Sequence, residues 1–186
     1  MNDQTKTALV PIADGTEEIE AVCIIDTLRR AGIRVTVASV MDLQITASRG
    51  VKLMADTTID SCTTHIYDLI ALPGGMPGAE YLAASKPLIA LLKAQKKAER
   101  LIGAICAAPA IVLQPNGLLA GTVATCYPSF QDHLESTLCS QDGVVVTGQT
   151  ITGQGPGWAL PFSLTLVEKL CGVSTRKDVA QGMLCE

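Results

Sequence analysis

Residues 101–113 read LIGAICAAPAIVL, and this segment gives the clearest indication of the fold in the whole sequence. The apolar run at 101–105 is typical of a buried strand, and it stops at the thiol of Cys106. Residues 107–113 predict a helix, with Pro109 in its first turn, where proline gives up an N–H that lacks an intrahelical partner anyway. We therefore expect Cys106 in a strand-to-helix turn above the carboxyl end of a sheet, which is the geometry of a nucleophile elbow.

This placement supports two interpretations of Cys106. The helix N-terminus, beginning with the N–H of Ala107, points unpaired N–H groups at the thiol and would lower its pKa, and the thiolate is the form that attacks carbonyls or is oxidised. A free cysteine behind a core strand is also commonly a buried structural residue. The local pattern alone leaves the reactive and the structural cysteine equally open.

Strands and helices alternate on both sides of this segment. The pattern predicts strands at 7–12, 33–39, 67–72, 101–105, 122–125 and 144–147, short β-like pieces around Ile45 and at 51–53, and helices at 17–31, 79–84, 87–98 and from the glycines at 153–157 through Leu170. Such alternation predicts the α/β class, a doubly wound α/β/α sandwich with a mainly parallel sheet. Because no repeat or linker divides the chain, we expect a single domain over residues 1–186.

Ligands in this architecture bind outside the carboxyl ends of the strands. Three segments are expected to meet there, namely the turn at 13–16, the PGGMPG turn at 73–78, and Cys106. Gly74 and Gly75 would let backbone N–H groups approach a reacting carbonyl oxygen closely, which makes this turn a candidate oxyanion site, with a plain turn as the alternative.

Acidic residues open the first predicted helix. We interpret Glu17 and Glu18 as first-turn acids that offset the helix dipole. Glu20 lies three residues further along, where its carboxyl can turn toward the sheet edge. Burial there would keep Glu20 protonated and able to donate a hydrogen bond to a thiolate.

The composition narrows the class of protein. The 186 residues are 48% hydrophobic and 17% charged, a globular balance, and no apolar run approaches the length of about 18 residues that spans a membrane. The net charge is −4, and the basic residues gather only at Lys93, Lys96, Lys97 and Arg100, which argues against specific nucleic-acid binding. Seven cysteines without a CxxC pair favour free thiols in a reducing compartment over disulfides or zinc. With no secretory signal in the first residues, we expect a cytoplasmic protein without metal or cofactor.

Five motifs together resemble the PfpI/ThiJ superfamily. They are ADGTEEIE at 13–20, ASRGV at 47–51, LPGG at 72–75, AICAAP at 104–109 and GPG at 155–157. The resemblance is closest to the branch of the parkinsonism-associated deglycase and the bacterial YajL-like proteins, and it covers about residues 7–170 in order and spacing. It implies a flavodoxin-like fold of the class I glutamine amidotransferase-like kind and a homodimer. It also implies Cys106 as nucleophile or oxidisable sensor, Glu20 as its protonated partner and Gly75 as a backbone donor.

The same resemblance implies a cofactor-free, cysteine-dependent protein of the stress response that acts on reactive carbonyls. One activity is a glyoxalase that turns methylglyoxal, a 2-oxoaldehyde, into lactate, and another is a deglycase of glycated proteins and nucleotides. The alternative is a non-enzymatic oxidative-stress sensor or redox chaperone that uses Cys106. Thiazole monophosphate biosynthesis, a label inherited with the ThiJ name, is disfavoured because the chain has no P-loop cradle for phosphate.

A peptidase or an amidotransferase is also disfavoured. The position after the nucleophile, where the protease-like branch has histidine, is Ala107, and the two histidines of the chain, His65 and His133, lie in polar contexts. In the loop after 122–125, Tyr127 stands where the animal pattern has histidine, so Glu20 would relay protons alone or with a water. The aromatic and glycine residues expected to line the pocket are Tyr127, Gly157 and Trp158, and the neighbouring Cys126 is interpreted as a small buried residue.

Overall fold

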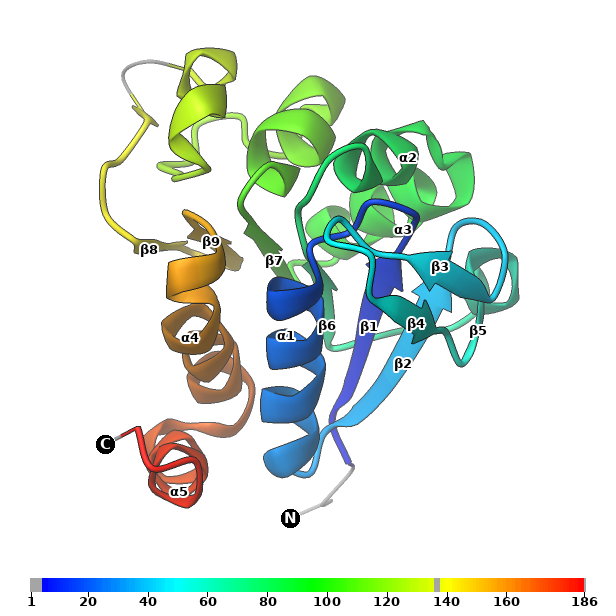
Figure 1. Cartoon of the computed structure of the whole chain (residues 1–186). Coiled ribbons are helices and arrows are strands. Elements are labelled where there is room, and N and C mark those ends of the chain that lie inside the picture. The colour runs from blue at the N-terminus through cyan, green and yellow to red at the C-terminus, as the bar shows by residue number, and fades with distance from the viewer. Residues whose placement is uncertain (1–4, 136–137, 186) are drawn as a thin grey trace.

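The computed structural model describes residues 5–135 and 138–185, and in this part of the chain a seven-stranded sheet forms the centre (Figure 1). The strand order is β5-β2-β1-β6-β7-β9-β8. The strands are β1 (Thr7–Ile12), β2 (Arg34–Ser39), β5 (Thr57–Thr58), β6 (Leu69–Leu72), β7 (Leu101–Ile105), β8 (Val144–Thr147) and β9 (Thr150–Gly153). All neighbours pair in parallel except β8, which runs antiparallel to β9. The predicted α/β class with a mainly parallel sheet is confirmed.

A separate antiparallel hairpin, β3 (Gln44–Thr46) with β4 (Lys52–Met54), follows β2. The helices of the described residues are α1 (Glu18–Arg30), α2 (Gly78–Ala84), α3 (Lys86–Lys97), α4 (Ala159–Cys171) and α5 (Val173–Gly182). Single 3-10 turns lie at Ile59–Cys62, Gln114–Asn116, Pro128–His133 and Pro156–Trp158.

Helices cover both faces of the sheet. On one face α1 and α4 lie side by side (Figure 1) and pack Leu28 and Phe162 against the β1 residues Ala8 and Val10. On the other face α2 and α3 pack against the alternate residues of the same strands, such as Leu9. Because both faces are buried, the central strands are continuous apolar runs rather than alternating ones, as expected for parallel sheets.

The sequence pattern places most of these elements within two residues, but it fails at the far side of β7. The strand predicted at 122–125 is wrong, since Ala124 forms only an isolated bridge with Cys139. The position beside β7 belongs instead to β9, which the pattern misses because TITGQGPG looks like a glycine-rich turn. The predicted helix at 107–113 contains a π-helical turn at Pro109–Leu113, and the sequence gives no expectation of α5.

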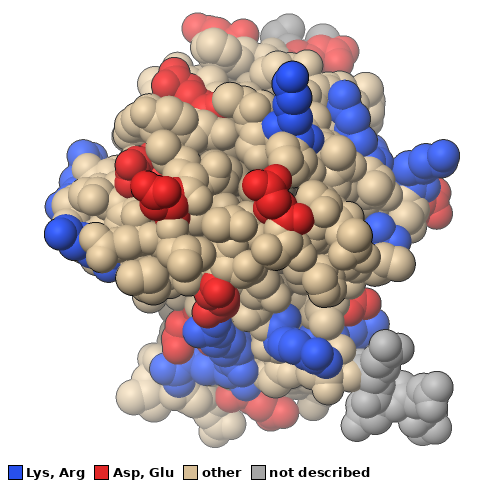
Figure 2. All heavy atoms as spheres, turned by 90° about the vertical axis from the view of Figure 1, so that its right-hand side faces the viewer, with Lys and Arg blue, Asp and Glu red and all other residues tan. Residues whose placement is uncertain are grey.

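The surface carries no strong charge asymmetry on the face shown in Figure 2, where acidic and basic side chains of the described residues are interspersed and form no continuous basic stripe. Within residues 5–135 and 138–185, every helix is too short or too polar to cross a bilayer.

Candidate active site

Cys106 stands at the carboxyl end of β7 with a φ of +63°, in the left-handed region that non-glycine residues rarely adopt. Such a conformation costs about 1–3 kcal/mol and needs surrounding structure to hold it. Two backbone hydrogen bonds do so, because the N–H of Cys106 donates to Gly153 O at 2.9 Å and the N–H of Tyr127 donates to Cys106 O at 2.9 Å. The predicted sharp turn is confirmed, and Cys106 is only 8% exposed.

Glu20 lies beside this thiol and is completely buried. Its Oε2 accepts a hydrogen bond of 2.8 Å from the N–H of Gly74. Its Oε1 makes no hydrogen bond of ordinary geometry within the described residues, and a side-chain interaction with Cys106 contributes to the pKa of both groups. The predicted convergence of α1, the glycine turn and the elbow is therefore present in the structure.

Two hydrogen bonds tie the first turn of α1 to the glycine turn, and a third lies within the start of α1. Glu17 caps the helix, since its Oε2 accepts the N–H of Glu20 at 2.8 Å. The N–H of Glu17 donates to Gly74 O at 2.9 Å, and Gly74 returns its own N–H to Glu20. We call this closed set the Glu17–Gly74–Glu20 ring. The spacing of three residues between two glutamates, as in a capping box, is the sequence signal that could have revealed it.

Glu18 lies in the same turn, but its side chain binds the β3–β4 hairpin. Its carboxylate accepts the hydroxyl of Ser48 at 2.9 Å and the N–H of Arg49 at 2.9 Å, so it fixes the tip of the β3–β4 hairpin. The prediction that Glu17 and Glu18 only offset the helix dipole is therefore incomplete, because each carboxylate accepts hydrogen bonds from specific partners.

The two glycines of the predicted oxyanion turn have different tasks. A Cβ at Gly74 would lie 2.6 Å from the Cβ of Cys106, and the N–H of Gly74 is already engaged by Glu20. Gly75 has a φ of +88°, and a Cβ there would collide with backbone atoms of Glu17. The N–H groups of Gly75 and Ala107 interact with the Cys106 sulfur and lower its pKa. Gly75 and Ala107 are therefore the donors at the thiol, whereas Gly74 holds the acid.

Burial dominates the protonation of both reactive side chains. It raises the pKa of Glu20 from 4.5 to about 7, and the charge of Glu17 adds to the rise. Burial also raises the pKa of the Cys106 thiol to about 12, with a further rise from the negative charge of Glu20. The lowered thiol pKa predicted from the elbow alone is wrong while Glu20 is ionised, because desolvation outweighs the N–H groups at the sulfur.

A proton on Glu20 reverses part of this effect. It removes the negative charge that opposes the thiolate, and the neutral carboxyl can donate a hydrogen bond to the sulfur. Because the pair loses its first proton near pH 7 and its second far higher, it holds one proton in total above pH 7. The form with a Cys106 thiolate and a Glu20 acid is the nucleophilic one.

The raised pKa of Glu20 makes the stability of the fold depend on pH. Above pH 4.5 the unfolded chain releases the proton that folded Glu20 keeps until about pH 7, so stability falls as the pH rises through this window. The full loss is about 3 kcal/mol, the equivalent of this displacement of the pKa. As the pH rises from 4 to 8.5, we expect the free energy of unfolding of Glu20→Gln to increase by about 3 kcal/mol relative to that of the wild type, measured by urea unfolding.

Glu18→Gln is the matched control for this measurement. Although burial opposes it, hydrogen bonds at Glu18 lower the pKa of that carboxyl, so the linked stability change has the opposite sign. A difference between Glu20→Gln and the wild type that stays constant with pH would contradict the assignment of a buried acid at Glu20.

The predicted pocket residues lie on two segments beyond the elbow. Tyr127 is 43% exposed, it is bound to Cys106 through its N–H, and its ring packs against Gly155, where a Cβ would lie 3.1 Å from the ring. Trp158 is 45% exposed, and its indole covers Gly143 at the start of β8. Gly157 is exposed beside it. Tyr127 is thus hydrogen-bonded directly to the elbow, whereas Gly157 and Trp158 lie in the turn that follows β9 in the chain.

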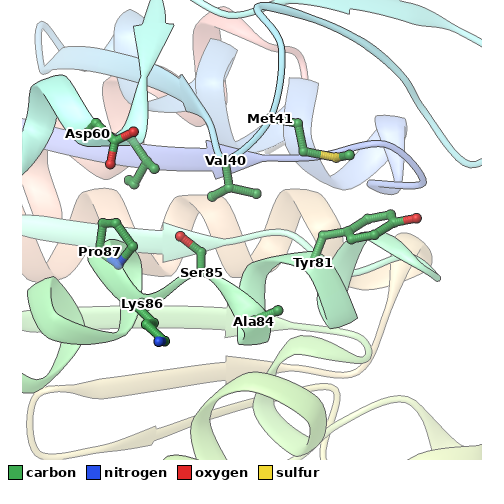
Figure 3. Close-up of a pocket in the computed structure, with 9 residues that line it drawn as sticks. Val40, Met41, Asp60, Tyr81, Ala84, Ser85, Lys86 and Pro87 are labelled. Atoms are coloured by element: carbon green, nitrogen blue, oxygen red, sulfur yellow. The ribbon is translucent and has the colours of Figure 1, made fainter.

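A groove of about 450 Å³ opens elsewhere, between the end of β2 and the junction of α2 and α3 (Figure 3). Val40, Met41 and Asp60 line it on one side, and Tyr81 and Ser85 of the α2–α3 junction line it on the other, while the Lys86 side chain points away from it. Neither Cys106 nor Glu20 belongs to its wall. We therefore do not place the chemistry in this groove.

Over 5–135 and 138–185, no three His, Cys, Asp or Glu side chains are grouped so as to hold a metal ion. His65 and His133 are both exposed, as predicted for His133, and Cys126 is fully buried, as expected.

Known proteins share both the sequence and the fold of this chain. The model of the DJ-1/PfpI family matches residues 6–169. Protein DJ-1 homolog B of Arabidopsis thaliana is 48% identical over 90% of this chain, which spans only 39% of that relative. A Caenorhabditis elegans protein named glutathione-independent glyoxalase DJR-1.2 is 35% identical over 90% of each chain. The solved structure of oxidized Toxoplasma gondii DJ-1 is 46% identical and superimposes with a TM-score of 0.95, over 97% of this chain and 98% of its own.

Proposed function

The chain belongs to the DJ-1/PfpI family, and we propose that it is a cofactor-free glyoxalase that converts methylglyoxal into lactate with Cys106 as nucleophile. The observation that carries this proposal is the pairing of Cys106, in its left-handed elbow, with a buried Glu20 whose pKa is raised to about 7. Nucleophile, acid and backbone donors then stand within one small site. The name of the worm relative supports the same chemistry.

The reaction needs only proton transfers and one water. The Cys106 thiolate adds to the aldehyde carbon of methylglyoxal, and the oxygen of that aldehyde becomes the hydroxyl of a hemithioacetal. We assign the stabilisation of the forming oxyanion to the N–H groups of Gly75 and Ala107, which interact with the Cys106 sulfur. Glu20 gives its proton to this oxygen and is left as a carboxylate.

Glu20 then acts as a base in the second half of the reaction. Its carboxylate removes the proton from the first carbon of the hemithioacetal, which gives an enediolate. A proton delivered to the second carbon, and transfer of the hydroxyl proton from the oxygen of the first carbon to that of the second, then give the thioester of lactate. Water hydrolyses the thioester, which releases lactate and restores the thiol. The sum is methylglyoxal plus water giving lactate, so no electron acceptor is consumed. The chain has Tyr127 where the animal pattern has histidine, so Glu20 is proposed to relay the protons of both steps alone or with a water.

Lactate production is the direct test. Protein treated with a chelator and freed of glutathione is incubated with methylglyoxal, and we expect one lactate for each methylglyoxal consumed. The control is the same protein after reaction with one equivalent of iodoacetamide, with the label located on Cys106 by mass spectrometry. Loss of methylglyoxal without lactate would contradict the proposal, because simple adducts with lysine and arginine consume the aldehyde in the same way.

A redox sensor is the second candidate, and the donors at the sulfur favour it. N–H groups from Gly75 and Ala107, with the acid of Glu20, are suited to hold the oxygens of a sulfinic acid formed by peroxide at Cys106. The Toxoplasma gondii relative was solved in a form described as oxidized. Deglycase activity on glycated proteins or nucleotides would use the same nucleophile on a larger substrate. The homodimer implied by the family resemblance and the cytoplasmic location stay predictions.

A further inference from the structure

Glu17 contributes to the site without being expected to touch the substrate. Resting on the proposed function of the Cys106–Glu20 pair, we propose that the charged carboxylate of Glu17 is a positioning residue that aims Glu20 at Cys106 and keeps the shared proton on Glu20. This assigns to the N-cap of α1 a role in the protonation of the site, beyond the capping that most helices receive.

The geometry gives Glu17 control over where Glu20 lies. Its Oε2 binds the N–H of Glu20 at 2.8 Å, and its own N–H binds Gly74 O at 2.9 Å. Gly74 in turn binds Glu20 Oε2, so Oε1 is the oxygen that stays free of hydrogen bonds among the described residues, beside the Cys106 side chain with which Glu20 interacts. Glu17 is only 9% exposed, so water screens its charge weakly. The Glu17–Gly74–Glu20 ring therefore couples position and charge in one small unit.

Glu17 supplies the charge that acts on Glu20. Burial raises the pKa of Glu20 most and the hydrogen bond from Gly74 lowers it, then the charge of Glu17 raises it and the hydrogen bond with Cys106 lowers it. Asp14 in the preceding turn accepts the N–H of Thr46, and Glu18 accepts from the hairpin.

Other elements packed on α1 bring little charge to this end. β1 and β6 carry no ionisable residue within their strand bounds, and the charged residues of α4, Glu168 and Lys169, lie in its last turn. Arg49 is exposed at the hairpin tip and meets Glu18 through its N–H. A negative charge at Glu17 thus has no described cation bound to it that would cancel its effect on Glu20.

Two substitutions separate charge from capping. Glu17→Gln keeps an oxygen that can cap the N–H of Glu20 but removes the charge, whereas Glu17→Asp keeps both the charge and a good capping side chain. The pKa of Glu20 is read directly by carbon-13 NMR of labelled glutamate carboxyls. The rate at which iodoacetamide alkylates Cys106 is followed from pH 5 to pH 9 by mass spectrometry.

We expect Glu17→Gln to lower the pKa of Glu20 and to slow the alkylation of Cys106 at pH 7 by about threefold to tenfold. A pKa that falls by one unit changes the protonation equilibrium of Glu20 about tenfold. Without the charge of Glu17, the pair shifts toward ionised Glu20 and neutral thiol. Glu17→Asp should restore both values, and Glu18→Gln should leave both unchanged. An unchanged Glu20 pKa in Glu17→Gln, or equal losses in the Gln and Asp variants, would overturn the proposal. Because neither readout uses methylglyoxal, failure of the glyoxalase assay would leave this test intact.

Discussion

Cys106→Ser is expected to lower kcat/KM for lactate formation by at least about 1,000-fold, the scale on which loss of a catalytic nucleophile acts. The serine hydroxyl has nearly the same shape as the thiol, so the elbow should still form. A hydroxyl ionises far less readily than a thiol, so the variant lacks the thiolate that attacks the aldehyde. Lactate is measured with a coupled dehydrogenase, and urea unfolding checks that the variant is folded.

Cys171→Ser is the control for this substitution. Cys171 is a half-buried free cysteine at the last position of α4, away from the carboxyl ends of the strands. Its replacement should leave lactate formation within about twofold of the wild type, as is usual for substitutions outside special sites. If Cys106→Ser kept more than a tenth of the activity, the nucleophile would have to be sought elsewhere.

Gly75→Ala is expected to destabilise the fold by about 3–5 kcal/mol, the range reserved for severe backbone and packing conflicts. The added Cβ would collide with the backbone of Glu17 and Gly15, at a φ of +88° that alanine disfavours. Relief of the collision must separate the glycine turn from α1, which breaks the bond from Glu17 N to Gly74 O. Urea unfolding gives the stability, and the alkylation rate of Cys106 reports the displaced N–H of Gly75.

Gly172→Ala isolates the contribution of the backbone angle. Gly172 has a φ of +89°, almost that of Gly75, but no atom lies within 4 Å of a Cβ built there. The unfavourable angle alone should cost about 1–2 kcal/mol. Equal losses of stability in the two variants would show that the close approach to Glu17 is unimportant.

The sequence predicts the strands and helices where a single apolar pattern controls them. β1, β7 and β8 are predicted to the residue, because each is a continuous run bounded by polar or turn residues. β9 is missed because two threonines and a glycine conceal a buried strand, whose burial depends on neighbours far away in the chain. The strand at 122–125 is predicted wrongly for the converse reason, as local β-preference there has no neighbour to pair with beyond Ala124.

The candidate site is predicted in its members but not in its protonation. Cys106, Glu20 and Gly75 are brought together as the motifs suggest, and Glu20 turns inward as expected. The pKa of the thiol depends on how deeply both groups are buried and on their mutual repulsion, which one-dimensional spacing does not contain. The separate tasks of Gly74 and Gly75 likewise depend on which N–H faces which acceptor.

The Glu17–Gly74–Glu20 ring also bears on how this site can evolve. Its hydrogen bonds interlock two backbone turns, so a substitution on that side changes nucleophile chemistry and folding together. Tyr127 and Trp158 are half-exposed, and none of the ring's hydrogen bonds involves their side chains, which can therefore be exchanged without breaking it. New substrate preferences should accumulate at these two aromatic residues, while the ring stays constant across diverging lineages.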